Sequence, residues 1–100
     1  MQDIFRVRDG ILKLCSPEKI YLFNLKKDMS GKATTSFKLC VIIEADDLPA
    51  IEKELYLGIE SGMPFDLVLY TPREWAEYSA EEQSFARRIL TEGTMIYERG

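Results

Sequence analysis

The stretch that decides the fold runs from Lys19 to Glu44 and reads KIYLFNLKKDMSGKATTSFKLCVIIE. Residues 19–25 are rich in tyrosine, leucine and phenylalanine, and residues 37–43 form a second apolar run with β-branched side chains. Both compositions are typical of β-strands. The Asp-Met-Ser-Gly sequence at residues 28–31 is typical of a turn. The sequence therefore predicts two strands joined by a polar turn.

Helix patterns lie on both sides of these two strands. Apolar residues at helical spacing predict a helix over residues 3–15, and the serine–proline pair after it ends the helix, because the residue before a proline avoids the α region. After the second strand, two aspartates predict an N-cap for a helix over residues 48–59. A third strand is predicted over residues 64–70, with Phe65, Leu67 and Leu69 on one face.

Two capping signals predict helices in the last third of the chain. Threonine, proline and glutamate at residues 71–74 form a capping box with proline in the first turn. A second capping box at residues 79–82 predicts the start of a further helix, which stops at Gly93. Residues 94–99 are predicted to form a short final strand.

The predicted element order is α-β-β-α-β-α-β within one domain, residues 1–100. This order indicates an α/β (α+β) fold with a mixed sheet of about four strands, and we expect its helices to pack mainly on one face. A chain of this length can bury a hydrophobic core without disulfides or metals.

The composition excludes several classes of function. The chain contains no histidine, which excludes histidine acid–base catalysis and histidine metal ligation. No apolar run is long enough to span a membrane, and the N-terminal residues lack the apolar centre of a signal peptide. Cys15 and Cys40 are too few for a disulfide framework and are expected to be buried thiols. We therefore expect a cytoplasmic protein.

Charge is unevenly distributed along the chain. Residues 1–43 carry eight lysines and arginines against four acidic residues, whereas residues 44–100 carry five against thirteen. The acidic total of −4 argues against a surface that binds duplex nucleic acid. Two interpretations of the lysines at 26, 27, 32 and 38 stay open: a local anion site, or a solvated loop beside a buried lysine.

Several segments resemble one known family. SPEKIYLF at residues 16–23, PFDLVLYTP at residues 64–72 and SFARRILTEGTMIYER at residues 84–99 resemble the minimal nucleotidyltransferases of the DNA polymerase β superfamily. The resemblance covers nearly the whole chain. It implies the nucleotidyltransferase fold, with a glycine–serine phosphate loop after the first strand and three metal-binding carboxylates.

The residues that carry the family's chemistry are changed in this chain. In a gap-free alignment the glycine–serine pair falls on Asn24 and Leu25, and the first two carboxylates fall on Ser36 and Lys38. The third carboxylate is kept as Asp66. Two catalytic metal ions need several converging carboxylates, and a lysine at such a site opposes Mg²⁺ binding. The resemblance therefore implies a degenerate active site without a metal.

Three functions follow as hypotheses. The first is a catalytically inactive domain that binds a protein, in an antitoxin-like role; the resemblance implies an HEPN-domain partner, and a homo-oligomer is also open. The second is a pseudoenzyme that binds a nucleotide or another anion without metal, through Lys38 and the weakly indicated Lys26, Lys27 and Lys32. The third is an active nucleotidyltransferase with an atypical site, which would need Mg²⁺ and a nucleoside triphosphate.

Two structural expectations follow from these hypotheses. An unpaired carboxylate at Asp66 is costly if it is buried, so we expect the Lys38 ammonium within about 4 Å of it. A protein-binding role predicts one exposed apolar patch. The candidates for that patch are Tyr56, Leu57, Met63, Met95 and Tyr97.

Overall fold

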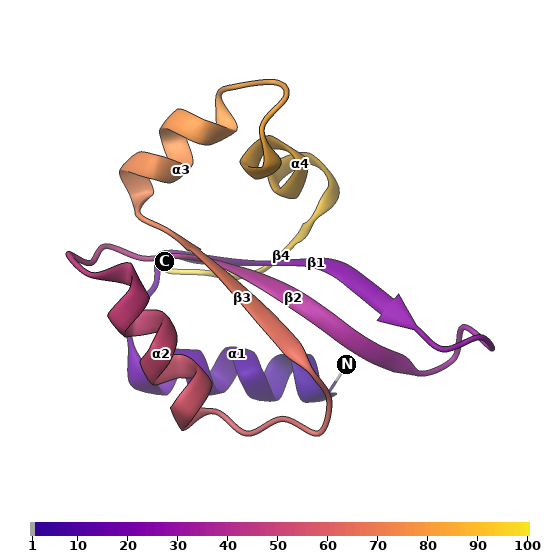
Figure 1. Cartoon of the computed structure of the whole chain (residues 1–100). Helices are drawn as coiled ribbons and strands as arrows, with labels where there is room; N and C mark the ends of the chain where they lie inside the picture. The colour runs from indigo at the N-terminus through magenta and orange to yellow at the C-terminus, as the bar shows by residue number, and fades with distance from the viewer. Residues whose placement is uncertain (1) are drawn as a thin grey trace.

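Four strands form a single mixed sheet in the computed structural model, which describes residues 2–100 (Figure 1). The strands lie in the order β3-β2-β1-β4. The antiparallel neighbours of β1 are β2 and β4, whereas β2 and β3 run parallel. Their bounds are Lys19–Lys27 for β1, Thr34–Ile42 for β2, Phe65–Tyr70 for β3 and Thr94–Glu98 for β4.

Two helices cover each face of the sheet (Figure 1). On one face lie α1 (Gln2–Leu14) and α2 (Leu48–Gly58), and on the other lie α3 (Pro72–Ser79) and α4 (Phe85–Glu92). The predicted mixed sheet and succession of elements are confirmed, with the last helical region divided into two helices. The helices do not gather mainly on one face, however, and this detail of the prediction needs correction.

The reason for the two helical layers lies in the central strand, which is apolar on both faces. Phe37, Leu39 and Val41 of β2 belong to the core beneath α1 and α2, whereas Cys40 and Ile42 belong to the core beneath α3 and α4. A strand that is apolar on both sides must be covered on both sides. The predicted division of β3 holds as well, because Leu67 packs in the first core and Val68 against the second.

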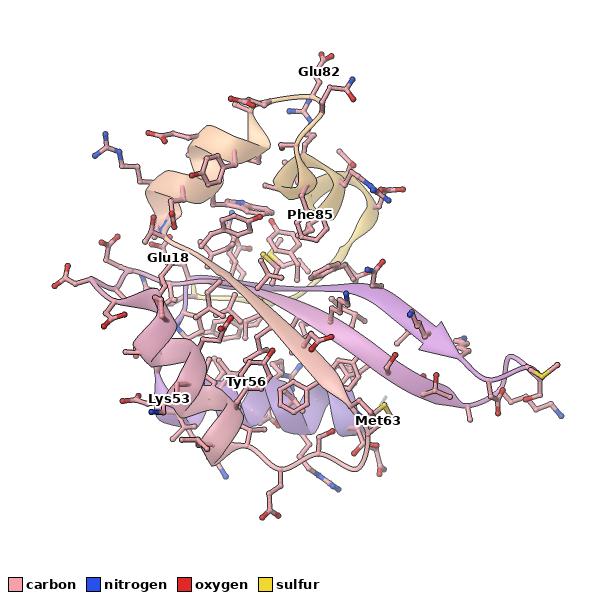
Figure 2. The ribbon with its side chains drawn as sticks, in the orientation of Figure 1. Glu18, Lys53, Tyr56, Met63, Glu82 and Phe85 are labelled. Atoms are coloured by element: carbon pink, nitrogen blue, oxygen red, sulfur yellow. The ribbon has the colours of Figure 1, made fainter. Side chains whose placement is uncertain are left out.

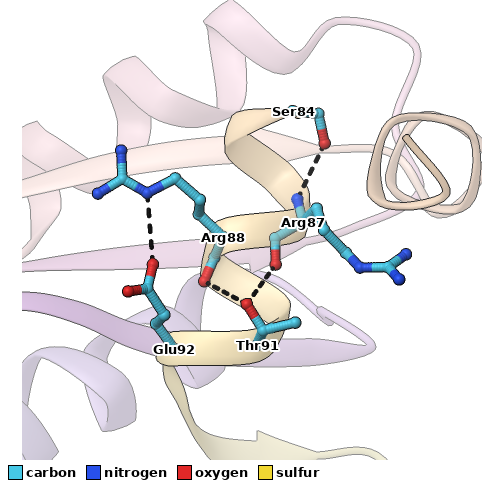
Figure 3. Close-up of polar contacts among 5 residues, drawn as sticks. All are labelled: Ser84, Arg87, Arg88, Thr91 and Glu92. Atoms are coloured by element: carbon cyan, nitrogen blue, oxygen red, sulfur yellow. Dashed lines mark hydrogen bonds and ion pairs between the residues drawn. The ribbon is translucent and has the colours of Figure 1, made fainter. Parts of the chain in front are cut away.

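The helix starts follow the predicted capping residues with one exception. The Asp47 carboxylate accepts a hydrogen bond from the Ala50 N–H at 3.1 Å, and Thr71 forms the expected capping box with Glu74. The second predicted capping box, at residues 79–82, was wrong, because Ser79 is the last residue of α3. Ser84 caps α4 instead, and its hydroxyl accepts a bond from the Arg87 N–H at 3.0 Å (Figure 3).

Ser79 cannot cap α4 because it is the last helical residue of α3, whereas an N-cap residue has a non-helical backbone directly before its helix. It is 9% exposed, and its carbonyl accepts a bond from the Arg87 guanidinium at 2.8 Å. Residues 80–84 then form a turn before α4 begins. Within residues 2–100, no helix is both long enough and apolar enough to cross a membrane.

Candidate functional site

Three of the residues singled out by the resemblance lie on one face of the sheet. Alternate residues of a strand share a face. On β2, Ser36 and Lys38 therefore share the face of Cys40, and on β3 Asp66 shares the face of Val68, so that all three project on the side of α3 and α4. The parallel register also places Lys38 directly beside Asp66. We call Ser36, Lys38 and Asp66 the shelf.

The shelf is open to solvent. Figure 1 shows β1 and β2 running out past α4 toward the hairpin tip, so this part of the sheet has no helical cover on that side. Asp66 is exposed and Ser36 and Lys38 are half-buried, whereas Cys40, further along β2, is completely buried. The three residues therefore form a surface rather than an enclosed cavity.

The expected ion pair between Lys38 and Asp66 is absent, and that prediction was wrong. Among residues 2–100, the ion pairs with a nitrogen–oxygen distance of 4.0 Å or less do not include these two side chains. The expectation assumed a partly buried carboxylate, but Asp66 is exposed and water can solvate it. An exposed pair gains little from contact, because each side chain loses conformational freedom on pairing.

Asn24, where the family has its glycine, adopts a glycine-like backbone. Its φ angle is 49°, which makes it the single non-glycine residue with positive φ in the described chain, residues 2–100. Asparagine tolerates this left-handed region better than most residues. The register of β1 against β2 shifts between Phe23 and Lys26, so Asn24 lies in a bulge. The sequence did not predict this bulge, although an asparagine inside an apolar run could have indicated it.

A small pocket lies beside Asn24, between β1 and α4. Its volume is about 200 Å³, and it is lined by Phe23 and Asn24 from β1 and by Phe85, Arg88, Ile89 and Glu92 from α4. The α4 residues are three and four positions apart and therefore share one helix face. Sequence reasoning missed them as site residues, although this spacing was visible.

The floor of the pocket is aromatic and its rim is charged. The Phe23 and Phe85 rings meet edge to face with centroids 5.5 Å apart, and Figure 2 shows Phe85 below α4, toward the sheet. At the rim, Arg88 Nε lies 3.3 Å from Glu92 Oε2 (Figure 3). The two opposite charges leave the pocket without a net preference for an anion.

The four predicted lysines divide into two groups. Lys26 is paired in register with Ser36, so it lies at the shelf together with Lys38. Lys27 and Lys32 lie at the far end of the hairpin, where both are exposed. Leu25 is also exposed and brings no hydroxyl to the bulge. The structure thus brings two of the lysines together with Asn24 and separates the other two from them.

The shelf offers little to a metal ion. Between residues 2 and 100, no three aspartate, glutamate, cysteine or histidine side chains come together as a ligand group. Cys40, on the same face of β2, has its pKa raised to about 12 by burial. Its thiol therefore stays protonated at neutral pH and is a poor ligand and nucleophile.

The five candidates for an apolar patch are accessible but do not form one patch. Tyr56, Leu57 and Met95 are exposed, and Met63 and Tyr97 are half-buried. The Tyr56 ring stacks on Phe65 at the β3 edge, while Met95 and Tyr97 lie on β4, which is the opposite edge of the sheet. The prediction of a single patch needs correction to two separate groups.

Tyr56 has a structural task at the β3 edge. Its hydroxyl oxygen accepts a hydrogen bond from the Leu67 N–H at 2.6 Å. An edge strand otherwise presents such N–H groups to solvent or to another chain. Tyr56 therefore covers one of the open backbone donors of β3.

The chain was compared with protein-family models, with curated proteins and with solved structures, and none of them matches it. Membership in the nucleotidyltransferase superfamily therefore stays a prediction that rests on the sequence resemblance alone.

Proposed function

We propose that this chain is a protein-binding domain on a nucleotidyltransferase-like sheet and that it does not transfer nucleotides. The observation that carries the proposal is the register of Lys38 beside Asp66. Where the resemblance requires a second metal-binding carboxylate, the chain places a cation next to the one carboxylate that is kept.

Electrostatics supports this conclusion. Catalysis by two metal ions depends on several anionic oxygen ligands that hold the cations about 3.5–4 Å apart. The shelf supplies one carboxylate, one neutral hydroxyl and one ammonium group. The ammonium group repels a divalent cation, and the hydroxyl of Ser36 is a weak ligand that cannot offset this repulsion.

Exposed apolar side chains on the surface support the binding of a protein. Apolar side chains are exposed on α2, at Tyr56 and Leu57, and on the edge strand β4, at Met95. Contiguous exposed apolar side chains, rather than single ones, mark sites of protein contact, so each of the two groups is a separate candidate surface. The resemblance makes an HEPN-domain protein, in an antitoxin-like pair, the first partner to test. Because Cys15 and Cys40 are unpaired thiols, we place this function in a reducing compartment such as the cytoplasm.

Binding of an anion without metal is the second candidate. One observation favours it: Lys26 and Lys38 lie on the same side of the sheet, next to the bulge at Asn24. Such a pair could bind a phosphate group as two point charges. In this case the bound anion would be held by the protein alone, and Mg²⁺ would add nothing.

A thermal-shift titration with ATP separates these functions. The protein-binding proposal predicts no change in Tm with ATP, whether Mg²⁺ is present or not. A shift without Mg²⁺ that is lost in Lys26→Gln/Lys38→Gln, with Lys13→Gln/Lys53→Gln as the charge-matched control, would favour anion binding instead.

An assay with α-labelled ATP tests transfer directly. We expect no labelling of any protein substrate by the wild-type chain. Labelling that is abolished by Asp66→Asn would overturn the proposal and establish an active nucleotidyltransferase.

A further inference from the structure

The outer half of the β1–β2 hairpin projects from the body of the molecule (Figure 1). Every residue from Asn24 to Ala33 is exposed, and Met29 near the tip is fully exposed. We call residues 24–35 the arm. Three lysines lie on it against a single aspartate, whereas the chain as a whole has a net charge of −4. The arm is therefore a basic projection from an acidic body.

The tip of the arm has a defined shape. The Asp28 carboxylate accepts a hydrogen bond from the Ser30 hydroxyl at 2.6 Å, and this bond lowers the pKa of Asp28. The Asp28 N–H donates to the Ala33 carbonyl at 2.8 Å, and Gly31 closes the turn with a φ angle of 74°. The turn thus orders the backbone on either side of Met29 without support from the core, which lowers the backbone part of the entropic cost of binding.

The surface that complements the arm lies where α3 and α4 meet. Between Arg73 and Arg87 the chain has four glutamates and no lysine or arginine. Glu77, Glu81 and Glu82 of this segment are exposed, and Figure 2 shows Glu82 at the outer end of the loop. Glu77 pairs with Arg73 at 3.2 Å, so the free negative charge is that of Glu81 and Glu82. We call residues 77–82 the corner.

The corner also carries an aromatic side chain and unpaired charge. Tyr78 is 45% exposed among the glutamates. Within the described residues, 2–100, neither Glu81 nor Glu82 has an ion pair at 4.0 Å or less. The corner therefore pairs negative charge with an exposed ring, as the arm pairs positive charge with an exposed methionine. Methionine sulfur makes favourable contacts with aromatic rings.

We infer that the arm of one copy docks on the corner of a second copy of this chain. Met29 packs against Tyr78, and Lys26, Lys27 and Lys32 face Glu81 and Glu82. The contact forms between copies because the arm and the corner of one molecule lie far apart in Figure 1. If the arm of the second copy also docks on the corner of the first copy, the two contacts form a closed dimer. If it docks on a third copy, the copies assemble head to tail.

Charge complementarity selects this occupant. The phosphates of a nucleic acid would attract the lysines but would make no apolar contact with Met29. The corner offers both kinds of contact, because its glutamates attract the lysines and its Tyr78 ring can pack against Met29. Attraction between exposed charges is screened by salt, so association should weaken as ionic strength rises.

Sedimentation equilibrium of the full chain tests the inference. We expect self-association at low ionic strength that weakens at least tenfold near 1 M salt, where the Debye length is about 3 Å. Reversal of charge on the arm, Lys26→Glu/Lys32→Glu, or on the corner, Glu81→Lys/Glu82→Lys, should each abolish it. An equimolar mixture of these two variants should associate again, because the reversed arm fits the reversed corner.

Two further variants serve as controls. Met29→Ser should weaken association at unchanged charge, while Lys13→Glu/Lys53→Glu alters the net charge as much as the arm variant but lies outside both surfaces and should leave association intact. A wild-type chain that stays monomeric at low ionic strength would overturn the inference, as would a mixture of reversed variants that fails to associate. Because no nucleotide takes part, neither result affects the test of the proposed function.

Discussion

Lys38 brings a positive charge to the shelf without forming an ion pair there among residues 2–100. It extends β2 in regular register with Asp66 of β3, yet the two side chains make no ion pair at 4.0 Å or less. The lysine therefore acts on the shelf through its charge rather than through a structural contact.

Replacement of Lys38 should have little effect on stability. We expect Lys38→Gln to change the free energy of unfolding by less than about 0.5 kcal/mol, as is usual for surface positions without a specific contact. Urea denaturation measures this change. A loss of 2 kcal/mol or more would show that the ammonium group stabilises Asp66 in solution, contrary to the structure.

Tyr56 is a residue for which the structure predicts a larger effect. Tyr56→Phe removes the hydroxyl that accepts the Leu67 N–H, and we expect a loss of about 1 kcal/mol in the free energy of unfolding. Tyr78→Phe is the matched control, since no hydrogen bond is formed by the Tyr78 hydroxyl within residues 2–100. Equal effects of the two substitutions in urea denaturation would argue against the bond.

The sequence could predict which residues share a face, but not what each side chain contacts. Alternation along β3 correctly placed Asp66 opposite Phe65 and Leu67, because strand periodicity is a local property. The degree of exposure of Asp66 depends on how far α3 and α4 extend over the sheet. That extent is a tertiary property, and no local pattern encodes it.

At the scale of elements, the start of α4 gives a direct test of the revised cap. Ser84→Ala should lower the free energy of unfolding by about 1 kcal/mol, the usual effect of losing an N-cap. Ser84→Thr keeps a hydroxyl that can accept from the Arg87 N–H and donate to the Tyr78 carbonyl, and it should retain most of the stability. If both variants unfold at the same urea concentration, Ser84 does not cap the helix.

The bulge in β1 gives a second test at this scale. Asn24 has a φ angle of 49°, where a β-branched residue is strained. We expect Asn24→Val to cost about 1–2 kcal/mol and Asn24→Gly to be neutral or stabilising. Thr94→Val, at an exposed position of β4 that pairs with Leu22 in regular register, is the control in the same denaturation series and should have little effect.

The misplaced cap shows why element boundaries were harder to predict than elements. The residues at 79–82 fit a capping box as well as those at 71–74 do. Only packing distinguishes them, because Ser79 is buried and closes α3 while Ser84 is free to accept the Arg87 N–H. Likewise, the sequence shows that both faces of β2 are apolar. It does not show which helices cover which face, because that depends on the chain topology.

At the scale of the whole molecule, burial of ionisable groups predicts how stability depends on pH. Burial raises the pKa of Cys40 from an ordinary value of 9.0 to about 12, and it also raises the pKa values of Tyr21, Tyr56 and Tyr70. Above pH 9 the unfolded thiol therefore loses a proton that the folded protein keeps. Unfolding then releases protons, so the free energy of unfolding falls as pH rises from 9 to 12.

Urea denaturation across this pH range checks the sign and the source of the effect. Stability should be nearly constant from pH 7 to 8.5 and then fall. Cys40→Ala should begin less stable, because it leaves a small cavity, but its stability should fall less steeply with pH. A slope identical to that of the wild type would show that the thiol is not responsible.

We propose that the shelf has a geometry suited to carboxylates and that, with Ser36 and Lys38 in place, it does not bind a metal. Calorimetric titration of Mn²⁺ into the wild-type chain and into the S36D/K38D variant tests this claim most directly. We predict no binding by the wild type and measurable binding by the variant, in which two new carboxylates join Asp66 on one face. Binding by the wild type, or a folded variant that does not bind Mn²⁺, would contradict the account.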